Sequence, residues 1–155
     1  MCFPRVPPNC RFEVDDFELE WTYQAESFDF IHARNICHSV NQWPVVLSEV
    51  MKHLKPGCWF ELAELGTEVF SDDNSVPDTW PPKYALDLLR ESLESLGRIN
   101  PTGKWLEELL NDAGFVDVEV RDPPTLADCA PSSTELNTPV HVSTAIINAS
   151  AGQDF

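Results

Sequence analysis

The chain has 155 residues, of which 43% are hydrophobic, and it carries 26 acidic against 10 basic residues for a formal charge of −16. That length suits one domain, and the apolar content is too high for a wholly disordered chain. The negative charge repels phosphate backbones and anionic lipid surfaces, which argues against binding to nucleic acid or to membranes. Apolar runs of only a few residues, with no apolar core at the amino terminus, predict a cytoplasmic or nuclear protein.

The cysteines and histidines form no recognisable metal or disulfide pattern. Five cysteines are an odd number, and none belongs to a Cys-x-x-Cys pair, so reduced thiols are expected. A metal site built from His32, Cys37, His38 and His53 is disfavoured, because this spacing fits no common zinc pattern. We therefore expect no bound metal.

Two short strands are expected in the first part of the chain. Residues 11–15 alternate polar and apolar side chains, the period of a strand that ends at Asp15-Asp16. Residues 27–33 are rich in aromatic and β-branched side chains, which suits a half-buried second strand.

A helix and a third strand follow directly. Apolar side chains recur at helical spacing over residues 43–54, and Pro44 lies near the start, where its missing N–H costs nothing. Pro56-Gly57 ends this helix, and residues 58–65 then read as a strand. A strand, a helix and a strand in this order predict a βαβ unit of a parallel sheet, and so an α/β fold.

The second half alternates helix and strand once more. Residues 71–82 are polar and proline-rich, which predicts a loop, and helices are expected over residues 84–96 and 104–113. Residues 115–120 alternate as a fourth strand. We expect a domain over residues 1–121 and a loosely ordered tail over residues 122–155, in which residues 140–147 could add a strand.

Several segments together resemble one known family, the fungal class I methyltransferases of the LaeA-like, secondary-metabolism-associated type. The resemblance covers about the first four-fifths of the chain. It is carried by residues 7–16 (PPNCRFEVDD), Trp21, residues 27–35 (SFDFIHARN), Trp43-Pro44, residues 53–62 (HLKPGCWFEL), residues 68–73 (EVFSDD) and residues 106–120, with the turn Asp112-Ala113-Gly114-Phe115.

The resemblance implies a Rossmann-like sheet of order 3-2-1-4-5-7-6 that binds S-adenosylmethionine, of which this chain would supply strands three to six. In the family an acid after the third strand accepts a hydrogen bond from the adenine amine, which implies this role for Asp15 or Asp16. The backbone of Phe17 would meet the adenine edge. His32, Ala33 and Arg34 would lie beside the methionine part of the cofactor. From the residues alone, the favoured interpretation is that Asp15 and Asp16 only end a strand. His32 could orient a substrate or act as a base, but a structural role is favoured for it. No catalytic residue is named.

One departure from the family pattern bears on activity. The family carries a Gly-x-Gly turn after its first strand, which lets the backbone approach the cofactor. The six glycines here, at positions 57, 66, 97, 103, 114 and 152, are too far apart to form it. The resemblance therefore implies a domain without its amino-terminal third.

Two functions follow from this reading. The first is an S-adenosylmethionine-dependent methyltransferase family member that is truncated and weakly active or inactive alone, with an unidentified small-molecule or protein methyl acceptor. The alternative is a non-catalytic interaction module that associates with itself or another protein through an exposed sheet edge and an acidic surface.

Overall fold

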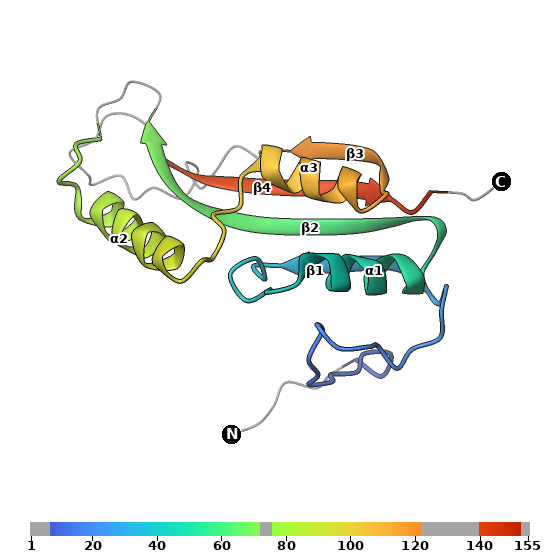
Figure 1. Ribbon diagram of the computed structural model, residues 1–155. Helices are drawn as coiled ribbons and strands as arrows, with labels where there is room; N and C mark the ends of the chain where they lie inside the picture. Colours follow the sequence, from blue (N-terminus) through green and yellow to red (C-terminus); the bar gives the residue numbers. More distant parts are fainter. Residues whose placement is uncertain (1–6, 72–75, 122–139, 153–155) are drawn as a thin grey trace.

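The computed structural model describes residues 7–71, 76–121 and 140–152, which form a four-stranded sheet with three helices (Figure 1). The elements in chain order are β1 (Phe28–Arg34), α1 (Trp43–His53), β2 (Leu54–Ser71), α2 (Pro81–Ser95), α3 (Gly103–Asp112), β3 (Val116–Arg121) and β4 (Val140–Ser150). The strand order across the sheet is β1-β2-β4-β3. The α/β expectation is confirmed.

The unit β1-α1-β2 confirms the predicted βαβ crossover. β1 and β2 run parallel, with Ile31 opposite Phe60 and Ala33 opposite Leu62. The helix ends at His53, before Pro56, and Gly57 turns the chain with a φ of +75°, a conformation that glycine adopts without steric cost. β2 is longer than expected and extends to Ser71.

The carboxy-terminal strand corrects the expected boundary at residue 121. β4 lies between β2 and β3 and runs antiparallel to both, so part of the 122–155 segment is central to the sheet. A strand over residues 140–147 was predicted and is confirmed. The rest of the expected tail, residues 122–139 and 153–155, lies outside the described residues.

The strand expected at residues 11–15 is not formed. Phe12 and Val14 are almost fully exposed, and no described strand pairs with this segment. Alternation alone does not make a strand, because the backbone N–H and C=O groups need a partner strand. The segment that the resemblance implied as strand three is therefore not part of the described sheet.

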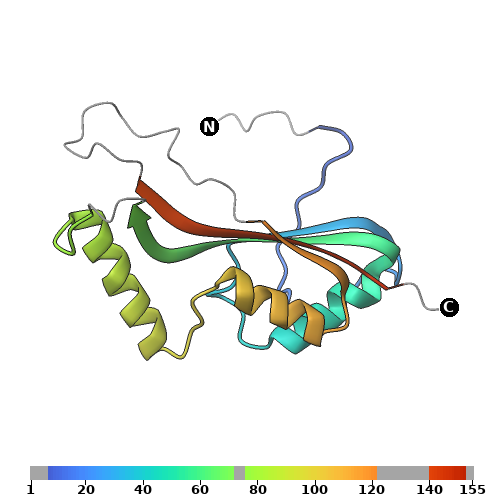
Figure 2. The ribbon, with the colours of Figure 1, turned by 90° about the horizontal axis from the view of Figure 1, so that it is seen from above.

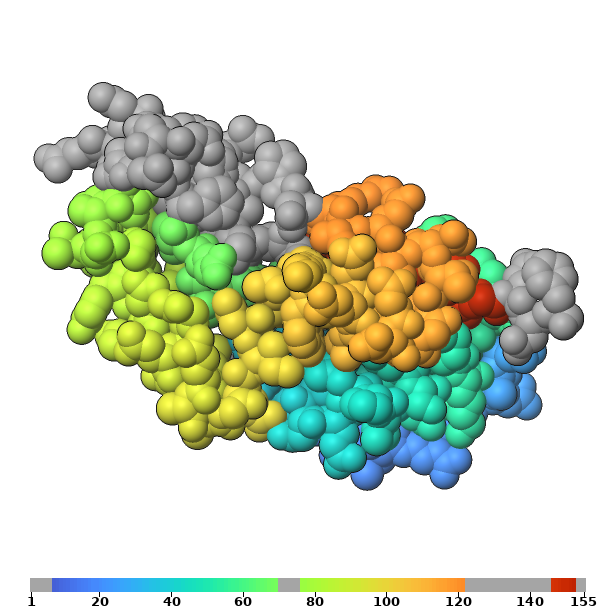
Figure 3. Space-filling view, turned by 45° about the horizontal axis from the view of Figure 1, so that its top comes forward, coloured from blue at the N-terminus to red at the C-terminus, as the bar shows by residue number. Residues whose placement is uncertain are grey.

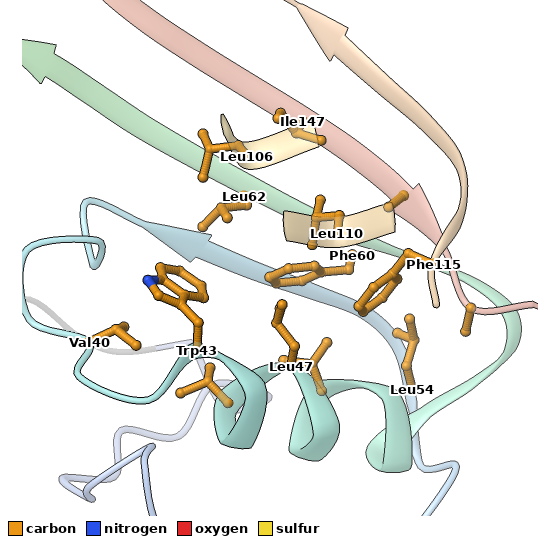
Figure 4. Close-up of a cluster of buried hydrophobic side chains, with 14 of the residues drawn as sticks. Val40, Trp43, Leu47, Leu54, Phe60, Leu62, Leu106, Leu110, Phe115 and Ile147 are labelled. Carbon is orange, nitrogen blue, oxygen red and sulfur yellow. The ribbon is translucent and has the colours of Figure 1, made fainter. Parts of the chain in front are cut away.

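All three helices lie on one side of the sheet (Figure 2). Alternate residues of β2, Phe60 and Leu62, point to this side and are fully buried. Leu47 of α1 and Leu110 of α3 pack onto them, as Figure 4 shows. The buried side chains form one hydrophobic cluster between α1, α3 and the sheet.

The opposite side of the sheet carries no helix among the described residues. Its side chains include Phe30 of β1, Trp59 of β2 and Val116 of β3, which are 53%, 41% and 44% exposed. We call this surface the open face. On this face Phe30 lies opposite Trp59, and the next pair along the two strands is His32 opposite Glu61. The open face is therefore apolar at the first pair and polar at the second.

Candidate functional site

The candidate site lies at the carboxyl ends of β1 and β2, where parallel strands of α/β proteins present their ligand-binding loops. Three segments lie together at this end of β1: residues 15–18, the loop 35–42 after β1, and the loop 96–102 between α2 and α3. Side-chain hydrogen bonds from Glu18 and Arg98 hold them together.

Glu18 fixes the amino-terminal segment to the start of α1. One carboxylate oxygen accepts hydrogen bonds from the backbone N–H groups of Asn41 and Gln42, at 2.7 Å each, and the other accepts from the Asn41 side chain at 2.9 Å. These bonds, with the Asn41 side chain contributing most, hold the pKa of Glu18 below its usual value. A carboxylate at this position also complements the positive end of the helix dipole.

Asp15 and Asp16 lie just before this anchor, in an exposed turn. The Asp15 carboxylate accepts from the Asp16 N–H at 2.8 Å, and the Asp16 carboxylate accepts from the Glu18 N–H at 3.0 Å. In each carboxylate one oxygen accepts a hydrogen bond within the turn, and the other oxygen has no such bond and can accept one from a ligand. Because Glu18 binds the loop after β1, this turn lies beside that loop, and its part in cofactor binding stays a prediction.

Phe17 is half-buried and packs against the core cluster. Its carbonyl oxygen accepts a hydrogen bond from the indole N–H of Trp21 at 3.1 Å, which holds the turn against the body of the protein. Trp21 in turn donates its backbone N–H to the Glu49 carboxylate of α1 at 2.9 Å.

The other predicted cofactor residues end β1. His32 is exposed on the open face, where its Nδ1 lies 2.7 Å from the Glu61 carboxylate. Ala33 is half-buried on the helix side, and Arg34 is the exposed last residue of β1. His32 and Ala33 thus face opposite sides of the sheet. What they have in common with the turn at Asp16 is a position near the carboxyl end of β1. The cofactor-binding roles of these residues remain predictions.

Glu64 is a functional candidate that the sequence reasoning missed. It is 2% exposed, and one oxygen accepts the backbone N–H groups of Ile36 and Cys37 at 2.8 and 3.1 Å. Burial raises its pKa, although those two N–H groups act in the opposite direction. Its burial could have been inferred from the sequence, because Glu64 follows Phe60 and Leu62 at every second position of the strand and so points to the same buried face.

The thiol of Cys37 lies in the same buried region. Burial, and secondarily the Glu64 carboxylate, raise its pKa far above the usual value. The thiol therefore stays protonated at neutral pH and is a poor nucleophile. Its role is to fill space beneath the loop after β1.

No group of three metal-binding side chains is present among the described residues. The two ring nitrogens of His53 lie 2.8 and 3.2 Å from the carbonyl oxygens of Glu49 and Tyr23, which occupy both positions a metal would need. The helices of the described part of the chain include none that is long and apolar enough to span a bilayer.

Comparisons with known proteins identify the family of the chain. Residues 4–120 match the family model described as a methyltransferase domain. The chain is 34% identical over 117 residues to the secondary metabolism regulator LAE1 of Cochliobolus heterostrophus, covering 74% of this chain and 38% of that protein. It is 34% identical over 111 residues to the methyltransferase pytC of Aspergillus terreus, covering 71% and 34%.

A third relative is the protein-methionine methyltransferase laeA of Emericella nidulans, 33% identical over 117 residues, with 75% of this chain and 31% of that protein covered. The chain thus spans about a third of the length of these curated relatives.

Solved structures show the same fold. The putative methyltransferase of Haloferax volcanii, solved with the Trm112 methyltransferase activator, aligns with a TM-score of 0.63 at 19% identity, covering 96% of this chain and 65% of that one. A phosphoethanolamine N-methyltransferase of Haemonchus contortus, solved with S-adenosyl-L-methionine, aligns with a TM-score of 0.55 at 14% identity, covering 89% and 36%. The chain belongs to the methyltransferase-domain family, as a member of the LaeA-like type of class I S-adenosylmethionine-dependent methyltransferases.

Proposed function

We propose that this chain forms the part of a methyltransferase that closes one side of the S-adenosylmethionine site and receives the methyl acceptor. The observation that carries the proposal is the pair of hydrogen bonds that the backbone N–H groups of Asn41 and Gln42 donate to the Glu18 carboxylate. They hold the acidic turn at Asp15-Asp16 beside the loop that follows β1, at the ligand-binding end of the parallel strands.

The residues present suit the cofactor in part. Asp15 and Asp16 keep carboxylate oxygens that accept hydrogen bonds from an amine, and the turn is exposed. The chain contains no Gly-x-Gly turn, so the close backbone approach that this turn allows must come from elsewhere. When bound, S-adenosylmethionine supplies the methyl group, and the protein's main task is to align the acceptor with it.

Cofactor binding is the direct test. Isothermal titration of S-adenosylmethionine into the purified chain is compared with titration into a fusion that carries the glycine-rich segment of a LaeA-like relative before Phe12. We expect no saturable binding by the chain alone and micromolar binding by the fusion. Stoichiometric micromolar binding by the chain alone would contradict the dependence on a second segment.

Two single variants of the fusion test the acidic turn. Asp15→Ala or Asp16→Ala is expected to weaken cofactor binding by about tenfold, the effect of losing one charge-assisted hydrogen bond. Asp29→Ala is the matched control, because Asp29 is also an exposed aspartate but lies at the other end of β1, paired with Lys55. If both turn variants bind as well as the control, the turn does not hold the adenine.

The alternative function, a non-catalytic interaction module, is favoured by the open face and by the edge of β1. Within the described residues β1 pairs only with β2, and the apolar side chains of the open face are uncovered. Light scattering after size-exclusion chromatography tests self-association. A dimer that Phe30→Asp dissociates, in a chain and fusion that both fail to bind the cofactor, would support the module and not the enzyme.

A further inference from the structure

A pocket of about 200 Å³ lies between the loop after β1 and the loop that joins α2 to α3. The first loop contributes Cys37, Val40 and Asn41, and Trp43 begins α1 beside them; the second contributes residues 96–99. In the space-filling view of Figure 3, the yellow atoms after α2 lie against the cyan atoms before α1. An engineered cavity of about 150 Å³ holds benzene, so this pocket has room for a molecule with one ring.

Arg98 gives the pocket a charged wall with unused donors. Its Nη1 donates to the Val40 carbonyl at 3.3 Å and to the Asn41 side-chain oxygen at 2.5 Å. The guanidinium is thereby fixed, while its Nε–H and Nη2 groups have no acceptor among the described residues. Those two groups form the planar edge that binds a carboxylate through two parallel hydrogen bonds.

Trp43 supplies a second, independent donor. The residue is 5% exposed, and its indole Nε1 has no hydrogen-bond partner among the described residues. Figure 4 shows this nitrogen on the side of the ring that faces Val40 and its loop. A buried N–H without an acceptor is costly, and a ligand oxygen in the adjoining pocket removes that cost.

Part of the wall is apolar and comes from Val40, Leu96 and Ile99. The nearby Glu18 carboxylate does not line the pocket, and the amide of Asn41 and the start of α1 already engage it. The thiol of Cys37 is uncharged. The pocket therefore presents two kinds of hydrogen-bond donor, a single cation and apolar surface to one occupant.

We infer that this pocket binds the methyl acceptor, and that the acceptor is a ring-sized molecule whose carboxylate is held by Arg98. The inference rests on the proposed function, because the pocket lies at the same carboxyl end of β1 as the proposed cofactor site. It assigns Arg98 and Trp43 to binding and positioning the acceptor and gives neither of them a part in the chemistry.

The test uses benzoate as the probe and benzamide as its uncharged analogue, with the full chain and no cofactor. Two-dimensional ¹H–¹⁵N spectra follow the indole N–H signals, and the Trp43 signal is identified by its loss in Trp43→Phe. We expect benzoate to shift the Trp43 signal saturably at millimolar concentration, and benzamide to bind about tenfold more weakly.

Arg98→Gln should abolish the preference for benzoate over benzamide, whereas Arg90→Gln should preserve it. Arg90 lies on α2 and pairs with Asp87, so it is a matched loss of charge outside the pocket. A purely structural role of Arg98 would weaken both probes equally and leave their ratio unchanged, which would overturn the inference.

The unaltered chain alone decides the matter if Arg98→Gln does not fold, and three outcomes are distinguished. Equal binding of benzoate and benzamide by the unaltered chain, or no shift of the Trp43 signal with either probe, overturns the inference. A selective shift with benzoate supports it. Since no cofactor is present, failure here is separate from failure of S-adenosylmethionine binding.

Discussion

The two faces of the sheet differ in what covers them. Helices bury the side chains of one face, whereas the apolar side chains of the open face are exposed among the described residues. Phe60 on the helix side is fully buried, while Phe30 on the open face is 53% exposed. Both are phenylalanines in neighbouring strands of one sheet. The fold is therefore held by α1, α3 and the β2–β4 pair, and the open face contributes little.

The largest expected effect is from Phe60→Ala. The substitution removes a fully buried ring that packs against Phe115, with ring centroids 5.6 Å apart. We expect the free energy of unfolding to fall by about 3–5 kcal/mol, the usual cost of truncating a buried phenylalanine. Urea denaturation followed by circular dichroism measures it. A loss as small as that of Phe30→Thr would mean that the two faces are covered alike.

The next effect concerns Glu64, whose carboxylate accepts two backbone N–H groups of the loop after β1. Glu64→Ala leaves both donors buried without an acceptor and should cost about 2–3 kcal/mol. Glu64→Gln retains an acceptor oxygen and should cost less. Denaturation curves of both variants at neutral pH check this order.

The raised pKa of Glu64 also predicts a pH dependence. The folded state holds this proton more tightly than the unfolded state, so its contribution is fully present below the ordinary value of 4.5 and is lost as the pH rises through the raised value. When the free energy of unfolding is measured as a function of pH, this decrease with rising pH should be absent in Glu64→Gln. Glu61→Gln is the control, since Glu61 points to the open face; an unchanged slope in Glu64→Gln would exclude this source.

A smaller effect is expected at the start of α3. Thr102 caps this helix, and its hydroxyl accepts the Trp105 backbone N–H at 3.2 Å. Thr102→Ala should lower the free energy of unfolding by about 1 kcal/mol. Thermal denaturation compares it with Thr79→Ala, an exposed threonine without such a bond; equal effects would show that the cap contributes nothing.

The smallest effect is expected on the open face. Phe30→Thr replaces an exposed ring with another residue that favours strands, so the free energy of unfolding should change by about 1 kcal/mol or less. The same denaturation experiment as for Phe60→Ala measures it. A loss of several kcal/mol would show that something covers this face in solution, for instance a second copy of the chain.

The contrast between the two faces also explains which elements the sequence could predict. The helix at residues 43–53 and the strands beside it were predicted because apolar spacing, Pro44 and Pro56-Gly57 are local signals, and the structure confirms them. The helices after residue 80 were predicted to within a few residues for the same reason.

Elements that depend on distant partners were harder to predict. Residues 11–15 alternate like a strand but have no described partner, whereas β4 mixes polar and apolar residues and is nevertheless central, because β2 and β3 pair with it. In the site, Asp15, Asp16 and Phe17 came from the family resemblance. Glu18, Glu64 and Arg98 were missed because their roles consist of hydrogen bonds to residues more than twenty positions away.

The position of β4 sets the order in which the sheet can be completed during synthesis. In the described sheet β3 pairs only with β4, and one edge of β2 is also unpaired until β4 is present. On the ribosome the β1-α1-β2 unit can form early from local contacts, while β3 must remain unpaired until the last described strand has left the exit tunnel. A nascent chain stalled before residue 140 should therefore expose one edge of β2 and the whole of β3 to chaperones.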